Sequence, residues 1–108
     1  MKRALVTGGH GFVASHLARA LLERGDAVTV LDLAPPPLSG LALQGIAPEV
    51  ELVEADLRDE QRVGATVEAS EFDVVFHLAA QTLVGPAMAE PAATFEANVR
   101  GTWTLLEA

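Results

Sequence analysis

Two adjacent glycines that interrupt an apolar run near the N-terminus constrain this chain more than any other feature. Residues 3–7 predict a short buried strand; the run breaks at Gly8 and Gly9, turns at Gly11 and resumes with helical spacing. A strand, a glycine turn and a helix N-terminus in this order favour phosphate binding, because main-chain N–H groups and the positive end of the helix dipole converge there. A purely structural tight turn is the alternative.

The glycines fit two related patterns with the same chemical meaning. They are G-x-G-x-x-A from Gly9, or G-x-x-G-x-x-A from Gly8, and both end at Ala14. In either pattern the first glycine makes the turn, Gly11 lets a pyrophosphate approach the backbone, and the small Ala14 lets the helix pack closely. We expect this helix to bury one broad apolar face and to end at Gly25, which suits a left-handed C-terminal residue.

An acidic residue follows the next apolar run at the position that a dinucleotide site requires. Residues 27–31 predict a buried parallel strand, and Asp32 stands at its end. Its separation from Gly8 is close to the roughly 20 positions typical of the acid that accepts both ribose hydroxyls. The alternative is a loop aspartate that caps a turn.

Composition limits the other kinds of site. The chain has 108 residues and suits one domain, residues 1–108, and half of its residues are hydrophobic, which is enough for a core. It contains no cysteine, and its histidines have no partners at metal-ligand spacing, so we predict neither disulfide nor metal. The net charge of −8 argues against nucleic acid binding, and a bound dinucleotide must be held by backbone dipoles.

Hydropathy argues against a membrane partner. No apolar run approaches the roughly 20 residues that span a bilayer, and the chain runs into its first strand without a signal-peptide pattern. We expect a protein of the reducing cytoplasm.

Strand and helix patterns alternate along the rest of the chain. We expect strands over 50–57 and 74–78, a helix from an N-cap at Asp59 to about residue 69, and a last helix from about Ala92. Three prolines predict a loop over 33–40, with one helical turn near 41–44, and we expect residues 81–91 to be irregular. This alternation predicts an α/β fold, a Rossmann-like parallel sheet of order 3-2-1-4.

In that fold the glycine turn, Asp32, Asp56 and residues 78–81 all lie at the carboxyl ends of strands, on one rim. The last helix carries two apolar stripes, one with Leu105 and a longer one, Phe95, Val99, Trp103 and Leu106. Because only one stripe can pack on the sheet, we expect the other to seek a partner, with a homodimer through this helix as one outcome. We therefore expect the chain to self-associate or to be marginally stable.

Four segments, in order and covering nearly the whole chain, carry a family resemblance. Residues 7–17 resemble the T-G-G-x-G-F-[IV]-G-S-H-L opening of extended short-chain dehydrogenases/reductases, in their NAD-dependent epimerase/dehydratase group. Residues 56–59 resemble that group's D-[LIV]-R-D, 76–81 its [VF]-H-L-A-A-Q, and 98–108 its N-V-x-G-T-x-x-L-L-E-A. Residues 80–91 are most similar to UDP-glucose 4-epimerase-like members.

The resemblance implies NAD as cofactor, with pyrophosphate, adenosine and nicotinamide contacts in chain order. The residues it implies are Gly8, Gly11, Phe12, Val13, Asp32, Leu33, Asp56, Leu57, Leu78, Ala79, Ala80, Gln81 and Asn98. Asp32 would favour NAD because a carboxylate repels a 2′-phosphate, and Asp56 would accept from the adenine amino group. Ordinary strand-end packing at 78–80 and a surface amide at Asn98 are the structural alternatives. For His77 and His16 we prefer structural roles, a strand histidine paired to backbone and a helix histidine near the turn.

Departures from the family pattern limit what the chain can do alone. Ala14 replaces the usual third glycine, and Ala87 stands where epimerase-like members often have serine. The family's chemistry depends on a Tyr-x-x-x-Lys pair, whereas this chain has no tyrosine and only Lys2 as lysine. We therefore expect an inactive cofactor-binding part of a longer nucleotide-sugar epimerase or dehydratase. A non-catalytic NAD sensor stays open, and an S-adenosylmethionine site is disfavoured by the Thr7-Gly8-Gly9 opening.

Overall fold

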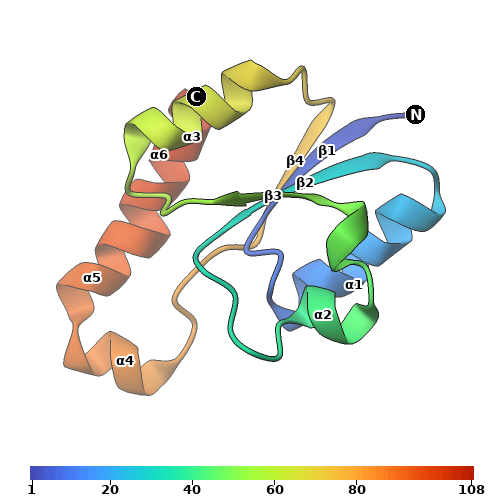
Figure 1. Cartoon of the computed structure of the whole chain (residues 1–108). Coiled ribbons are helices and arrows are strands. Elements are labelled where there is room, and N and C mark those ends of the chain that lie inside the picture. Colours follow the sequence, from blue (N-terminus) through green and yellow to red (C-terminus); the bar gives the residue numbers. More distant parts are fainter.

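A computed structural model describes residues 1–108 and has one parallel sheet with helices on both faces (Figure 1). The strands are β1 (Arg3–Thr7), β2 (Ala27–Asp32), β3 (Glu51–Glu54) and β4 (Val74–His77). Their order in the sheet is β3-β2-β1-β4, which confirms the predicted α/β Rossmann-like topology. The two central strands therefore carry the glycine turn and Asp32 side by side.

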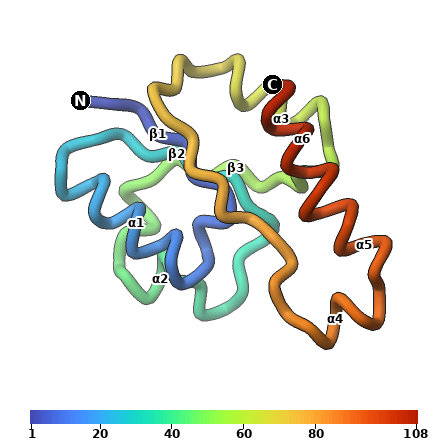
Figure 2. Tube along the Cα trace, turned by 180° about the vertical axis from the view of Figure 1, so that it is seen from behind, coloured from blue at the N-terminus to red at the C-terminus, as the bar shows by residue number.

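The helices divide between the two faces of the sheet, as the view from behind also shows (Figure 2). They are α1 (Phe12–Glu23), α2 (Gly40–Gln44), α3 (Glu60–Ala69), α4 (Val84–Ala89), α5 (Pro91–Phe95) and α6 (Gly101–Glu107). A 3-10 turn, η1 (Ala47–Glu49), precedes β3, and a π-helical turn, η2 (Glu96–Arg100), joins α5 to α6. None of these helices has the length and apolar character needed to cross a membrane.

Alternation along β1 builds two separate cores. Ala4 and Val6 lie under α1 and α2 in a cluster that includes Ala14, whereas Leu5 lies on the opposite face with Leu57. Successive side chains of a strand point to opposite faces, so a central strand that is apolar throughout is buried on both. The smallness of Ala14, which is 2% exposed, allows α1 to approach the sheet as the sequence predicts.

Two predicted helix ends are confirmed, at Asp59 and Gly25, and a third cap, Ser39, was not predicted. The Asp59 side chain accepts from the Arg62 N–H at the start of α3, and Ser39 caps α2 by accepting from Ala42. Gly25 follows α1 with φ of +91°, the left-handed conformation expected of it. The predicted turn at 41–44 is α2 itself.

Two predicted segments were wrong. The third strand ends at Glu54 and not at residue 57, and residues 81–91 contain the helix α4 in place of an irregular loop. Pro86 does not prevent this helix, because it is the third residue of α4, where an N–H has no intrahelical acceptor. Pro91 likewise begins α5 at the first helical position, which proline favours.

The proline-rich loop, residues 33–39, is fastened at both of its ends. The Leu33 N–H donates to Asp32 Oδ1 at 2.7 Å, and the Gly40 N–H donates to the His10 carbonyl at 2.7 Å. A Cβ on Gly40 would meet Ser15 Oγ and would lie 2.6 Å from the Gly11 carbonyl oxygen. The end of this loop therefore packs directly on the glycine turn.

Candidate functional site

A cleft of about 400 Å³ lies along the carboxyl ends of the strands. Its lining residues are Gly8, Gly11, Leu31, Asp32, Leu33, Ala55, Asp56, Leu57, Leu78, Ala79, Ala80, Gln81, Thr82 and Ala97. The structure thus brings most of the predicted site residues into one cavity, but leaves Phe12, Val13 and Asn98 outside its lining. A second hollow of about 270 Å³ adjoins it and shares four of its lining residues, Leu33, Asp56, Gln81 and Ala97.

The turn at Gly8 can be made only by glycine. Its φ is +73°, and a Cβ there would lie 2.9 Å from both the main-chain nitrogen and the Cα of Ala79. Gly8 also donates its N–H to the Leu31 carbonyl at 3.0 Å, and the Gly11 N–H donates back to the Gly8 carbonyl at 3.0 Å. The absent side chain keeps the floor of the cleft open where β1, β2 and the loop after β4 converge.

The N-terminus of α1 has main-chain donors to offer. No side chain caps this helix at Gly11, and the first backbone bond made there runs from the Ser15 N–H to the Gly11 carbonyl. The N–H groups of residues 12–14 therefore remain free for an anion. Phe12 and Val13 turn exposed side chains away from the cleft, so any contact they make there is through their backbone.

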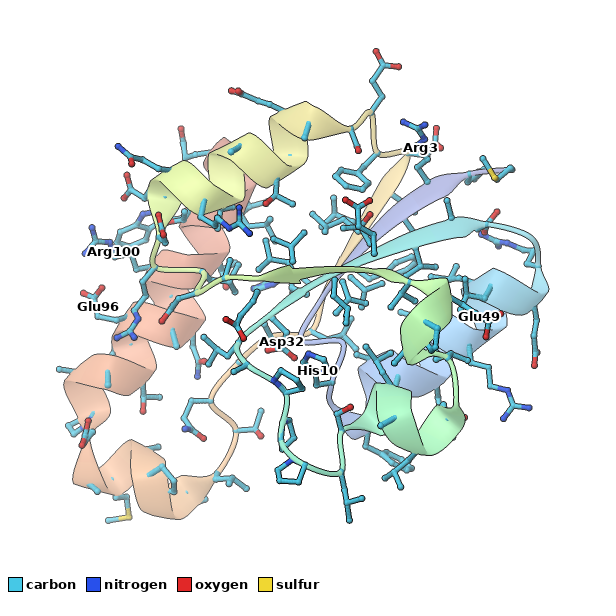
Figure 3. All side chains as sticks on the ribbon, in the orientation of Figure 1. Arg3, His10, Asp32, Glu49, Glu96 and Arg100 are labelled. Atoms are coloured by element: carbon cyan, nitrogen blue, oxygen red, sulfur yellow. The ribbon has the colours of Figure 1, made fainter.

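The Asp32 carboxylate is oriented by two main-chain donors. Its Oδ2 accepts from the His10 N–H at 3.0 Å, and its Oδ1 accepts from the Leu33 N–H at 2.7 Å. Figure 3 shows the two side chains of His10 and Asp32 next to each other, between β2 and the proline loop. Each carboxylate oxygen keeps a lone pair, so the group can accept two further hydrogen bonds from a diol.

The Asp56 carboxylate is already engaged. Arg58 donates to it from its main-chain N–H at 2.9 Å and from its guanidinium, with Nη2 at 2.7 Å from Oδ2. The guanidinium hydrogen bonds, together with the backbone bond and the charge of Arg58, hold the pKa of the Asp56 carboxyl below its usual range. A ligand amino group could reach Asp56 only by sharing it with Arg58, whose side chain is half exposed.

The loop after β4 is held by an amide clamp. Asn98 Oδ1 accepts from the Gln81 N–H at 2.6 Å, and Asn98 Nδ2 donates to the Gln81 carbonyl at 2.9 Å. Asn98 thus lies behind the cleft wall, where it fixes the backbone of a lining residue. The structural alternative considered for Asn98, a surface amide, therefore does not describe it.

The prediction for His77 was wrong in its partners. The imidazole contacts two hydroxyl groups, Thr7 Oγ1 at 2.7 Å and Thr102 Oγ1 at 2.9 Å, and no backbone group. His16 lies on the first turns of α1 as predicted, where its ring is edge-on to Phe12 at 4.9 Å and contacts the Gln44 amide. No group of three or more His, Cys, Asp or Glu side chains is arranged to hold a metal ion.

Four lining residues were missed by the sequence analysis. Leu31 and Ala55 directly precede Asp32 and Asp56, so their places at the ends of β2 and β3 were a usable signal. Thr82 and Ala97 come from the loop and helix that cross above the sheet, and no local pattern marks them.

Comparison with known proteins decides the family. Residues 4–108 match the NAD dependent epimerase/dehydratase family. The chain belongs to that family. It is 40% identical over 108 residues to dTDP-glucose 4,6-dehydratase of Mycolicibacterium smegmatis, covering 98% of this chain and 32% of that protein. It is also 40% identical over 103 residues to UDP-glucose 4-epimerase of Halalkalibacterium halodurans, covering 95% of this chain and 29% of that protein.

Solved structures agree with this membership. The chain superposes on UDP-glucose-4-epimerase from Stenotrophomonas maltophila with a TM-score of 0.86 and 30% identity, covering 99% of this chain and 33% of that one. That enzyme was crystallised with NAD and formylated UDP-arabinopyranose. The chain spans about a third of the length of the relatives it matches.

The geometry of the cleft suits this family's dinucleotide. The uncapped N-terminus of α1 offers free N–H groups to an anion, the missing side chain at Gly8 leaves room beside it, and the Asp32 carboxylate stands at the next strand end with lone pairs left for a diol. Eight of the 14 lining residues are hydrophobic, which suits the flat faces of the adenine and nicotinamide rings.

Proposed function

We propose that this chain supplies the NAD site of a nucleotide-sugar epimerase or dehydratase. The observation that carries the proposal is the juxtaposition of uncapped α1 amides with the Asp32 carboxylate, which two main-chain N–H groups aim into the same cleft. NAD chemistry would supply a hydride acceptor and donor, so that a sugar carbon is transiently oxidised. The choice of sugar nucleotide, and that between epimerisation and dehydration, would depend on residues outside these 108.

Each group then has a defined task within the cleft. The amides of Phe12 and Val13, at the start of α1, bind the pyrophosphate. Asp32 accepts both hydroxyls of the adenosine ribose, and its charge disfavours a 2′-phosphate. Asp56 accepts from the adenine amino group, which requires Arg58 to share the carboxylate.

The remaining predicted contacts border the adenosine and the nicotinamide. Leu57 packs beside the adenine ring, and Leu33 borders the ribose. Residues 78–81 line the nicotinamide half of the cleft, and Asn98 holds that segment from behind through Gln81.

Cofactor preference tests the proposal directly. Isothermal titration of the chain with NAD⁺ and with NADP⁺ should give the tighter binding for NAD⁺. Asp32→Asn keeps the shape of the side chain and removes its charge. Because a hydrogen bond to a charged group contributes about 1.5–3 kcal/mol, NAD⁺ should bind to this variant about 10-fold or more weakly. The preference for NAD⁺ over NADP⁺ should also shrink.

The matched control removes one negative charge elsewhere. Asp59→Asn keeps a capping oxygen at α3 and lies outside the cleft lining, so both affinities should stay unchanged. Equal affinity of the unmutated chain for the two dinucleotides would disprove the ribose role of Asp32. No detectable binding of either would refute the function as a whole.

A dinucleotide sensor without chemistry is the second candidate. It is favoured by the lack of any tyrosine in these 108 residues, because the family's acid/base is a tyrosine. The coding sequence beyond Ala108 discriminates the two: a Tyr-x-x-x-Lys segment there supports the enzyme, and a stop codon supports the sensor.

Self-association is a further part of the proposal. Phe95, Val99, Trp103 and Leu106 form one exposed stripe, with 48% to 81% of each residue accessible. Such a continuous apolar surface favours burial against another surface. A homodimer through α5 and α6 would cover it; a cytoplasmic location stays a prediction of the sequence.

A further inference from the structure

We propose that His77 is a positioning residue for the cofactor cleft, held as the neutral Nε2–H tautomer between two threonine hydroxyls so that it fixes the loop after β4. Its ring lies at the end of β4, between Thr7 of β1 and Thr102 of α6. The link to cofactor affinity rests on the proposed function; the tautomer and the fixing of the loop do not.

The Thr7 hydroxyl determines which ring nitrogen carries the proton. Its oxygen receives the Leu78 N–H at 3.1 Å and the Ala79 N–H at 3.2 Å, and the Leu78 N–H is shared with the Thr7 carbonyl at 3.3 Å. A hydroxyl has two lone pairs and one hydrogen, so both lone pairs face donors and the hydrogen is left for His77. At 2.7 Å from Thr7 Oγ1, Nδ1 of His77 is therefore the acceptor.

The role of the other ring nitrogen follows from this assignment. With Nδ1 accepting, the neutral imidazole carries its hydrogen on Nε2 and donates it to Thr102 Oγ1 at 2.9 Å. The Thr102 hydroxyl in turn donates to the Asn98 carbonyl at 2.6 Å, inside the π-helical turn η2. Every donor and acceptor in this series of hydrogen bonds has one role, so the direction of the bonds is fixed from Thr7 to Asn98.

Both ends of this series of hydrogen bonds reach residues that line the cleft. The side chain of Asn98 holds both main-chain groups of Gln81, and Ala79 begins the series as a donor to Thr7. His77 therefore connects the two points at which the loop 78–81 is fastened, one on β1 and one on η2. Since Leu78, Ala79, Ala80 and Gln81 all line the cleft, the shape of its nicotinamide half depends on this connection.

Protonation of the ring conflicts with this arrangement. A hydrogen on Nδ1 would face an oxygen that already receives two N–H groups, and burial lowers the pKa of His77 in agreement with a neutral ring. The charged groups on the elements that contact the ring are Arg3 on β1, the Glu96–Arg100 pair on η2 and Glu107 on α6. None of these hydrogen-bonds to the imidazole, so no carboxylate is present to stabilise an imidazolium.

The first experiment reads the tautomer and needs no cofactor. Nitrogen-15 NMR of the histidine-labelled chain at pH 7 should show His77 with Nδ1 unprotonated and Nε2 protonated, hydrogen-bonded at both. His16, which is exposed on α1 and whose ring is contacted by the Gln44 amide, provides the internal comparison. A His77 signal with hydrogen on Nδ1, or on both nitrogens, would overturn the proposal.

The second experiment tests positioning by conservative rescue. Thr102→Val removes the acceptor for His77 and keeps the shape, so amide hydrogen exchange at Ala79 and Gln81 should accelerate about threefold to 10-fold, as expected for one hydrogen bond. NAD⁺ affinity should fall by a similar factor. Thr102→Ser restores the hydroxyl and should restore both readouts, whereas His16→Gln should change neither.

The outcomes separate this proposal from the function. If the amide hydrogens of Ala79 and Gln81 exchange at the same rate in Thr102→Val and Thr102→Ser, His77 does not position the loop. If the unmutated chain binds no NAD⁺ yet the exchange rates respond as expected, positioning holds and the proposed function fails. If exchange responds but NAD⁺ affinity does not, the link from the loop to the cofactor is wrong.

Discussion

The strongest structural prediction concerns two glycines that share a conformation and differ in surroundings. Gly8 has φ of +73° and Gly25 has φ of +91°, so alanine is strained at both. A Cβ on Gly25 would meet nothing within 4 Å, whereas one on Gly8 would lie 2.9 Å from the main chain of Ala79. Gly25→Ala therefore measures backbone strain alone, and Gly8→Ala measures strain together with the collision.

The two terms can be sized from the contacts. Strain at positive φ costs about 1–2 kcal/mol, less about 0.4–1 kcal/mol gained from the stiffer unfolded chain, so Gly25→Ala should lose about 1 kcal/mol of unfolding free energy. In Gly8→Ala the colliding atoms are backbone and must move. That motion weakens the bonds from Leu78 and Ala79 to the Thr7 hydroxyl, at about 1 kcal/mol each, so the total loss is about 3 kcal/mol.

Urea unfolding followed by circular dichroism measures both variants. With a slope of about 2 kcal/mol per molar urea, the midpoints of the two variants should differ by about 1 M. Gly25→Ala should bind NAD⁺ as the unmutated chain does, and Gly8→Ala should not bind. Equal midpoints would show that the loop after β4 yields freely, and the argument that Gly8 maintains an open floor would be refuted.

Three further predictions concern charge and surface. The backbone hydrogen bond from Lys2, and then Arg24, keep the pKa of Asp26 below its ordinary 3.8. The urea midpoint of the unmutated chain should therefore exceed that of Asp26→Asn by its full amount above pH 4, and this difference should disappear as acid protonates the carboxyl. Burial lowers the pKa of His77 from 6.5, so on acidification the unfolded chain binds a proton at His77 at a higher pH than the folded chain does. The thermal midpoint should therefore fall as the pH drops below 6.5, and His77→Asn should make the midpoint depend less on pH. Trp103→Glu should reduce self-association in sedimentation equilibrium, and a monodisperse, very stable unmutated monomer would contradict the exposed-stripe argument.

The topology and the rim of the cleft followed from local signals in the sequence. Apolar runs of strand length, a glycine turn and an acid at a strand end act over a few residues, and Asp32 and Gly8 lie where such patterns place them. The helix α4 did not follow, because Gly85 and Pro86 are turn residues unless they fall in a first helical turn.

Long-range partners explain the other failures. The hydroxyl partners of His77 lie 70 and 25 positions away in the sequence, and no periodicity links them. The pairing of Asp56 with Arg58 is local, yet a carboxylate and a guanidinium two residues apart pair only when the turn between them directs both side chains to one side. Side-chain chemistry across elements therefore required the structure.

The proline loop that follows β2 is held at both ends: Leu33 donates to Asp32, whose other oxygen accepts from His10 in the glycine turn, and Gly40 donates to the His10 carbonyl. Its middle residues, Pro35 to Pro37, are exposed and carry no such ties. A peptide inserted between them would leave both anchors intact, a few residues from Asp32 and Leu33, which line the cleft. The loop is therefore a graft point for a fluorescent reporter, whose emission should respond to added NAD⁺ if the proposed function holds.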